Sequence, residues 1–345
     1  MENIYLYMII ALAFLAIADL VVGISNDAVN FLNSAIGSKA ISFRTIMIVA
    51  SIGVAVGAIF SSGMMEVARK GIFNPGEFMF NEIMIIFMAV MITDILLLDF
   101  FNSLGMPTST TVSIVFELLG AAVAMALIKI GASSGDFSDV VNYINTSKAS
   151  QIIFGILLSV VVAFSIGALV QWVSRLLLSY NFQRKANWVG ALFSGIALTA
   201  ITYFIFMKGL KGTSYAKQSF DIIGGSTMKD FLETQVLTIV LISSVFWSLL
   251  SYGLIVFTKT NIYKLIIIVG TFALALAFAG NDLVNFIGVP VAAYNAFLEW
   301  SASGLSATEF PMDVLASKVP TNNWLLFGAG MVMVVTLWFS TKAKD

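Results

Sequence analysis

Residues 4–36 read IYLYMIIALAFLAIADLVVGISNDAVNFLNSAI, an apolar run whose polar side chains gather mainly after Gly23. A helix of about 20 apolar residues is enough to cross a membrane, so this run suffices for one crossing and is too long for a straight one. No Lys or Arg precedes it and no small-residue cleavage site follows it, so we interpret it as a first membrane segment rather than a signal peptide. This stretch predicts a membrane protein.

The composition extends that prediction to the whole chain. Of its 345 residues, 59% are hydrophobic and 11% are charged, against about 45–50% and about 25% in soluble proteins. This excludes a soluble enzyme and a disordered protein, and the net charge of −1 offers no cationic field to attract nucleic acid. Cysteine and histidine are absent, which excludes thiolate and imidazole chemistry. We expect no cofactor.

About nine hydrophobic segments follow one another along the chain. They are rich in Leu, Ile, Ala and Met and lack the alternation of about ten residues that marks an outer-membrane barrel. The fold class predicted is therefore an all-α polytopic membrane protein. The segments lie near residues 4–36, 45–68, 83–104, 107–130, 150–176, 188–207, 234–257, 262–297 and 322–341.

The basic residues predict the orientation in the membrane. Three connections carry positive charges only, the C-terminal tail carries two lysines, and basic connections of this kind lie on the cytoplasmic side. We expect the N-terminus to lie outside the cell and the C-terminus in the cytoplasm. The membrane expected is a bacterial inner membrane, whose lipids are partners of the protein. The basic residues that define it are Lys39, Arg44, Arg175, Arg184, Lys185, Lys259, Lys264, Lys342 and Lys344.

Two segments that run in opposite directions on this path share a polar motif. The first contains GISNDAVNFLNSAIG (Gly23–Gly37), and the second contains GNDLVNFIGVPVAAY (Gly280–Tyr294). Both include N-D-x-V-N-F, and the same motif in oppositely directed segments indicates inverted-topology repeats with broken helices and a site at their interface. We expect a first repeat at 1–131, central helices at 132–261 and a partial second repeat at 262–345.

The motif residues offer oxygen atoms inside the membrane. If the first helix breaks near Gly23 or Ser25, carboxylates, amide oxygens and free carbonyls would form a site for a hard cation such as Na⁺. Amide N–H groups could meanwhile donate to an anion. The alternative is that these side chains only cap a broken helix or bond across helices. The candidate residues for both roles are Asn26, Asp27 and Asn30 in the first copy and Asn281, Asp282 and Asn285 in the second.

A third polar element is LGMPTSTTVS, from Leu104 to Ser113. Gly105 and Pro107 interrupt the helix, and Pro suits the first turn of a new one. The hydroxyls of Thr108, Ser109, Thr110 and Thr111 then adjoin unpaired backbone N–H groups, which is an arrangement that binds a tetrahedral oxyanion without Lys or Arg. The alternative is a capped helix start whose hydroxyls bond the preceding turn.

Together the paired N-D-x-x-N motifs and the P-x-S-T-T motif resemble the inorganic phosphate transporter (PiT) family of ion-coupled phosphate symporters. The resemblance implies a phosphate site between Ser109, Thr110 and Thr111 and the Asn/Asp motifs. It also implies sites for a coupling cation, Na⁺ or H⁺, at Asp27, Asn30, Asp282 and Asn285. The resemblance is strongest over residues 20–131 and next strongest over residues 262–297. Residues 132–261 match the family only as hydrophobic segments.

The chain departs from the family pattern in several places. Val112 replaces the usual His, Val29 and Val284 replace Ala, and Ala50 stands where an acidic residue is usual. No second P-x-S-T-T follows the second motif. We therefore expect an N-terminal portion of a longer transporter or a natural short form.

The function expected is symport of inorganic phosphate with Na⁺ or H⁺ by alternating access. Three alternatives stay open: a sulfate or related oxyanion permease of the same architecture, a membrane-embedded aspartyl hydrolase, and a non-transporting subunit. The oligomeric state is also open, with a homodimer as one candidate. Four further acids in apolar stretches are expected to be partnered polar groups between helices: Glu66, Asp94, Asp99 and Glu117.

Overall fold

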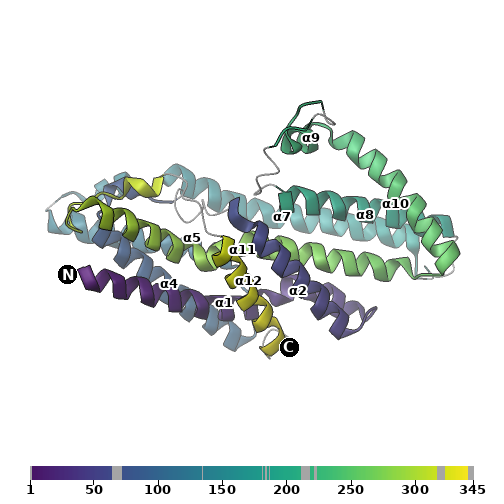
Figure 1. The fold of residues 1–345 in the computed structure, drawn as a ribbon, viewed down its shortest axis with the longest axis horizontal. Coiled ribbons are helices and arrows are strands. Elements are labelled where there is room, and N and C mark those ends of the chain that lie inside the picture. Colours follow the sequence, from purple (N-terminus) through teal and green to yellow (C-terminus); the bar gives the residue numbers. More distant parts are fainter. Residues whose placement is uncertain are drawn as a thin grey trace. The chain divides into compact units, whose positions relative to one another are not determined.

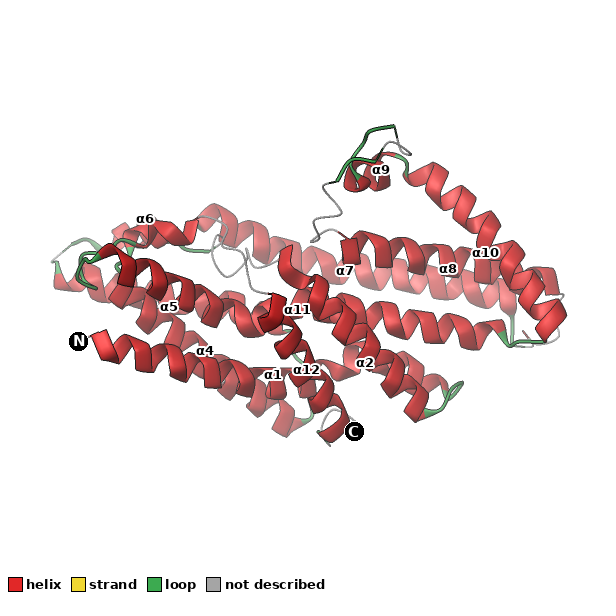
Figure 2. Cartoon of the chain, viewed as in Figure 1, coloured by secondary structure: helices red, strands yellow, loops and turns green. Residues whose placement is uncertain are grey.

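The computed structural model describes residues 2–63, 72–133, 135–180, 182, 185, 187–210, 218–220, 224–316 and 323–340. These residues form helices and connecting loops, and the only β-type pairings among them are isolated bridges (Figure 2). The prediction of an all-α membrane protein is confirmed. Glu66, Arg184, Lys342 and Lys344, which were named from the sequence, lie outside the described residues.

Each of the nine predicted hydrophobic segments coincides with a helix (Figure 1). Seven helices in the described ranges are long and apolar enough to cross a membrane, while α2 and α12 have 17 residues each and are shorter. The count of nine crossings therefore stays a prediction. The nine helices are α1 (Glu2–Ser38), α2 (Phe43–Ile59), α4 (Phe80–Leu104), α5 (Thr110–Ala132), α7 (Thr146–Leu178), α8 (Asn187–Leu210), α10 (Val236–Thr258), α11 (Ile262–Ser303) and α12 (Asn323–Phe339).

The helices form two compact units. Unit 1 comprises Met1–Asn30, Ser61–Ile153 and Phe278–Asp345, and unit 2 comprises Phe31–Phe60 and Phe154–Ala277. The chain passes from one unit to the other within α1, α7 and α11. Both N-D-x-V-N motifs and the P-x-S-T-T motif belong to unit 1. The division into 1–131, 132–261 and 262–345 stays a prediction.

One sequence expectation is wrong: α1 and α11 are not broken at the motifs. α1 is a continuous helix of 37 residues, and α11 is continuous over 42 residues with Pro290 inside it. Gly, Asn and Asp have weak helix propensity, but tertiary packing overrides such preferences. The motif side chains bond to each other and to neighbouring helices, so they leave the backbone of α1 and α11 helical.

The core of unit 1 includes an aromatic group at the start of α4. The rings of Phe80 and Trp300 are stacked with their centroids 4.5 Å apart, and Tyr5 meets both edge-on at 5.0 and 5.1 Å. The indole N–H of Trp300 donates to the Leu305 carbonyl at 3.0 Å. Aromatic pairs of this kind stabilise a fold by more than their buried area alone accounts for. They therefore hold α1, α4 and α11 together at the end where α4 begins.

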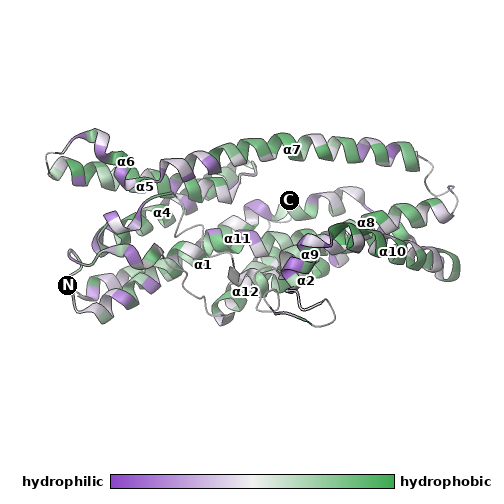
Figure 3. Cartoon of the chain, turned by 90° about the horizontal axis from the view of Figure 1, so that it is seen from above, coloured by the Kyte–Doolittle hydropathy of each residue, from purple (hydrophilic) through white to green (hydrophobic). Residues whose placement is uncertain are grey.

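Unit 2 is packed through small residues. A Cβ added to Gly53 or Gly57 of α2 would lie 2.7 or 2.3 Å from the backbone oxygens of Phe272 and Leu276 in α11. Close helix contact at glycine is the usual way in which membrane helices associate. In contrast, the most apolar 18-residue stretch of α7 contains no buried residue, and Figure 3 colours most of this helix as hydrophobic. This surface suits contact with lipid.

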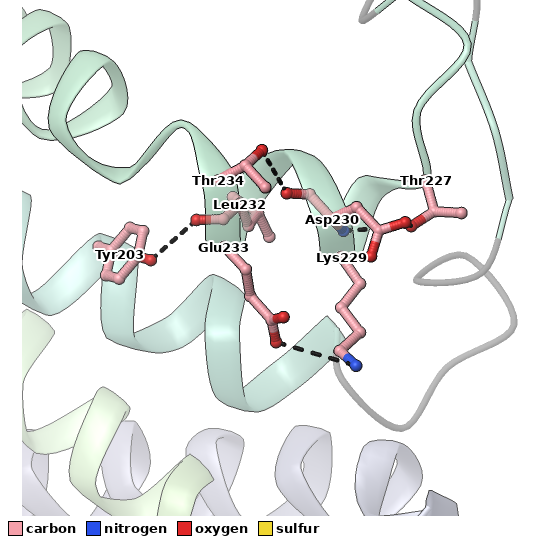
Figure 4. Close-up of polar contacts among 7 residues, drawn as sticks. All are labelled: Tyr203, Thr227, Lys229, Asp230, Leu232, Glu233 and Thr234. Atoms are coloured by element: carbon pink, nitrogen blue, oxygen red, sulfur yellow. Dashed lines mark hydrogen bonds and ion pairs between the residues drawn. The ribbon is translucent and has the colours of Figure 1, made fainter.

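A short helix, α9 (Met228–Thr234), precedes α10 in unit 2 (Figure 4). Thr227 caps its start, because its hydroxyl oxygen accepts a hydrogen bond of 3.1 Å from the Asp230 N–H. The Tyr203 hydroxyl of α8 donates to the Leu232 carbonyl at 2.9 Å. These contacts attach the connection to α8.

Candidate functional site

The site is built around the interruption between α4 and α5. α4 ends at Gly105, which adopts a left-handed conformation with φ of +67° that is readily available to glycine. α5 begins at Thr110, and the Ser109 hydroxyl caps it by accepting from the Val112 N–H at 3.4 Å. The predicted helix break is therefore confirmed, whereas the new helix starts three residues after Pro107, which was expected in its first turn. They place Thr110 and Thr111 at a helix end whose N–H groups favour anions.

Asn26 of α1 holds this interruption in place. Its Oδ1 accepts from the Thr108 N–H at 2.8 Å, and its Nδ2 donates to the Met106 carbonyl at 3.1 Å and to Asn102 Oδ1 at 2.9 Å. Asn102 in turn donates to the Val22 carbonyl at 2.9 Å. The Asn26 amide was predicted to bind an anion, but here both its donor and its acceptor groups are engaged by the break. Its observed role is to fix the loop.

The first motif forms an internal pair on α1. Asn30 Nδ2 donates to Asp27 Oδ1 at 3.1 Å, and Asp27 is 2% exposed. The second Asp27 oxygen, Oδ2, is buried and accepts no hydrogen bond, although the Thr110 side chain lies beside this carboxyl group. Among the described residues, Thr110 is thus the neighbour closest to providing this buried oxygen with a partner.

The second motif repeats this pair on α11 and extends it to α5. Asn285 Nδ2 donates to Asp282 Oδ1 at 3.1 Å, the same distance as in the first copy. It also lies 2.9 Å from Thr111 Oγ1 and 3.3 Å from Thr110 Oγ1. The Thr111 hydroxyl donates to Asp282 Oδ1 at 3.2 Å. Both motif copies thus converge on the first two residues of α5.

Close packing of α1 and α11 supports this convergence. A Cβ added to Gly23 would lie 2.1 Å from Cε1 of Phe286, and Phe286 is fully buried. Only a residue without a side chain permits this contact. Gly23 precedes Asp27 by one helical turn, and Phe286 follows Asn285 directly, so the packing contact sets the distance between the two motifs.

The predicted site residues are therefore placed in three ways. Asp27, Asn30, Asp282, Asn285, Thr110 and Thr111 come together in one polar network. Thr108 and Ser109 belong to the interruption, where they meet Asn26 and cap α5. Asn281 is half-buried beside Asp282 and makes no hydrogen bond in the described part of the chain.

The network is rich in oxygen and contains two carboxyl groups. The Asp27 and Asp282 carboxyl groups are close enough to interact electrostatically. Among the described residues, the ion pairs join Lys129 to Glu82 and Lys229 to Glu233, so none of them supplies a cation here. Carboxylate and hydroxyl oxygens are ligands for hard cations. Asp27, Asn30, Asp282 and Asn285 therefore stay the predicted cation ligands.

Two residues that contribute to the polar contacts of unit 1 are not predicted from the sequence. Asn102 is one, although a polar residue three positions before Gly105 in an apolar helix is a readable signal. Asp19 is the other, since it lies in α1 two turns before Asp27 and is fully buried. Asp94 and Glu117, which were expected to be partnered between helices, do share a partner, because both contact the Ser113 hydroxyl.

Comparison with known proteins adds independent information. A family model described as the phosphate transporter family matches residues 24–342. A relative from Pyrococcus furiosus that carries the name phosphate permease is 24% identical over 90% of this chain and 68% of its own length. A second such relative, from Thermococcus kodakarensis, is 24% identical over 90% of this chain and 69% of its own.

A solved structure shows the same fold. It is named "The sodium-dependent phosphate transporter", and it matches with a TM-score of 0.65 at 19% identity, over 97% of this chain and 76% of that chain. At this identity the likeness concerns the fold alone. It agrees with the helical membrane architecture described above.

Proposed function

Because the chain belongs to the phosphate transporter family, we propose that it carries inorganic phosphate across the membrane in symport with Na⁺ or H⁺. Members of this family are transporters, so the chain is not an enzyme. The observation that carries the proposal is the convergence of both motif copies on Thr110 and Thr111 at the start of α5.

The start of α5 supplies the anion-binding part. The first N–H groups of a helix have no partner within it, and the helix dipole favours negative charge there. The Thr110 and Thr111 hydroxyls add donors that suit the oxygens of a tetrahedral anion. Thr108 and Ser109 complete the loop, with Asn26 as the positioning residue and Asn281 as a further amide donor at its edge.

The two carboxylates make a cation necessary. Two unit charges about 4 Å apart interact by about 4 kcal/mol at an effective dielectric constant of 20, so phosphate beside Asp27 and Asp282 would be repelled. A cation held by Asp27, Asn30, Asp282 and Asn285 reverses this effect. Each ion then lowers the cost of burying the other, which is how uptake of the two becomes coupled.

The hydrogen bonds also favour an order of binding. Thr111 donates its hydroxyl hydrogen to Asp282 at 3.2 Å, so this donor is engaged by a carboxylate. A cation bound to Asp282 would compete for that oxygen and release the hydroxyl toward phosphate. We therefore expect the cation to bind first.

Alternating access is the transport mode expected of such a site in inverted repeats. The two repeats would move around it with the N-terminus outside and the C-terminus in the cytoplasm. The coupling ion is transported with phosphate and is not a cofactor. Sulfate remains the main competing substrate, because hydroxyl and N–H donors discriminate poorly between tetrahedral anions.

The test is uptake of labelled phosphate by proteoliposomes that contain the purified chain. Gradients of Na⁺ and of H⁺ are imposed separately, and sulfate and arsenate are added as competitors. The proposal expects uptake that requires one of the gradients and that excess unlabelled phosphate or arsenate suppresses more than sulfate does. Uptake of sulfate in preference to phosphate, or no uptake and no phosphate binding, would contradict it.

A further inference from the structure

A second buried polar group lies in unit 1, away from the two motifs. Asp94 of α4 and Glu117 of α5 both approach the hydroxyl of Ser113, and Asp19 of α1 lies beside Asp94. Asp19 precedes Asp27 by eight residues, which corresponds to about 12 Å along a helix. We call Asp19, Asp94, Ser113 and Glu117 the acidic cluster.

The distances around Ser113 require an additional hydrogen atom. Ser113 Oγ lies 2.7 Å from Asp94 Oδ1 and 2.6 Å from Glu117 Oε1, and both are hydrogen-bond lengths. A serine hydroxyl carries one hydrogen and can donate it to only one of the two carboxyl groups. The other contact needs a hydrogen that the carboxyl group itself supplies. At least one of Asp94 and Glu117 is therefore protonated in this geometry.

The position of Asp19 independently indicates that the cluster binds a proton. It is fully buried, and no N–H or O–H group of the described residues donates a hydrogen bond to either of its carboxyl oxygens. Its side chain is directed at Asp94, within hydrogen-bonding reach. Two carboxyl groups that face each other in the protein interior need a proton between them.

The neighbours that the described residues provide add no positive charge. The other titratable group that acts on Asp19 and Asp94 is Asp27, which is also acidic. The ion pairs of the described residues lie elsewhere, at Lys129–Glu82 and Lys229–Glu233. Protons are therefore the species that allow the cluster to stay buried in a membrane segment.

A cleft borders the acidic cluster. Ser113 and Glu117 line this cleft of about 520 Å³ between α4 and α5, and Thr108 of the interruption lines it too. Glu117 is half-buried, whereas Asp19 and Asp94 are fully buried. Glu117 is therefore the least buried carboxyl group of the cluster and the one that borders the cleft.

We propose that the acidic cluster is a proton-binding site, separate from the cation site at Asp27 and Asp282, and that it exchanges a proton during each transport cycle. This inference rests on the proposed function. The exchange breaks the O–H bond at the Glu117 carboxyl group and forms one on a water molecule in the cleft. The reverse step restores the proton from water on the other side.

Infrared spectroscopy of the full chain in nanodiscs tests the protonation directly. Near neutral pH, the wild-type protein should show the C=O band of a protonated carboxyl group, shifted in D₂O. Glu117→Gln or Asp94→Asn should remove it or reduce its area by about half or more. Asp99→Asn, an exposed acid in the same helix, should leave it unchanged. A wild-type spectrum without this band would overturn the proposal. Loss of the band on addition of Na⁺ alone would also overturn it, because the proton would then occupy the cation site rather than a separate one.

Proton counting in proteoliposomes tests the exchange. With equal Na⁺ on both sides, a lumenal pH dye and labelled phosphate give the protons moved per phosphate. Glu117→Gln or Asp19→Asn should move about one proton fewer than wild type, and the comparison cancels protons released by phosphate itself. Phosphate binding by calorimetry should stay within about twofold. An unchanged ratio would overturn the inference, whereas wild-type protein that binds no phosphate would overturn the proposed function instead.

Discussion

The Thr111 hydroxyl donates a hydrogen bond of 3.2 Å to Asp282 Oδ1, which links the start of α5 to the second motif on α11. The same hydroxyl oxygen accepts from Asn285 Nδ2 at 2.9 Å. Thr111 therefore stands at the point where the proposed anion site and the proposed cation site meet.

Replacing Thr111 by Val should weaken phosphate binding, since Val keeps the shape and removes the donor. A hydrogen bond to a charged group contributes about 1.5–3 kcal/mol, so the dissociation constant should rise roughly 10-fold to 100-fold. Calorimetry in detergent with saturating Na⁺ measures it. Thr111→Ser keeps the hydroxyl and should stay near wild type. Equal affinities for the Val and Ser variants would remove Thr111 from the phosphate site.

Replacing either motif aspartate by Asn should abolish cation-dependent phosphate uptake. Asp27→Asn and Asp282→Asn each remove one negative charge from the pair that would hold the cation, while keeping side-chain size. Uptake by proteoliposomes under a Na⁺ or H⁺ gradient should fall to background. Glu299→Gln changes an exposed acid of α11 in the same way and should transport normally. If either aspartate variant retained coupled uptake, that aspartate would not be a ligand of the coupling cation.

Much of the fold follows from hydrophobic segments and helix punctuation. Gly105, Pro107 and Ser109 predict the break between α4 and α5 because their effects are local: a left-handed turn, a missing N–H and a side-chain cap. The same reasoning fails near Gly23 and Ser25, where it predicts a break in a helix that is continuous. There the polar groups find partners on the helix surface, and only tertiary structure reveals that.

The candidate site shows the same division. The repeated N-D-x-V-N motif predicts that both copies contribute to one site, and the structure adds the internal pairs Asp27–Asn30 and Asp282–Asn285. It cannot reveal that Asn26 is engaged by the backbone of Met106 and Thr108, because those partners lie 80 and 82 positions away. Asp19 was missed because a lone acid in an apolar run carries no motif, and its neighbours come from α4 and α5.

The contact between Gly23 and Phe286 predicts a stability effect. Gly23→Ala places a methyl group where the ring now lies, 2.1 Å from Cε1, and overpacking of this kind typically costs about 1–3 kcal/mol. The unfolding temperature in detergent should fall. Gly120→Ala is the matched control, because a Cβ there meets nothing within 4 Å and Ala favours the helix. Phe286→Leu should partly restore the Gly23→Ala variant, and a lack of any difference between the two glycine variants would contradict the close packing.

Replacing Asn26 by Ala should loosen the interruption without removing a phosphate ligand. The substitution frees the Thr108 N–H, the Met106 carbonyl and Asn102 from their shared partner, and each unsatisfied group costs about 1–3 kcal/mol when buried. Hydrogen exchange over residues 102–109 should accelerate, and phosphate affinity should fall with it. Thr111→Val is the contrasting variant, because it should weaken binding while exchange in 102–109 stays at the wild-type rate. If Asn26→Ala lowered affinity with exchange unchanged, Asn26 would contact phosphate directly, and its assignment as a positioning residue would be wrong.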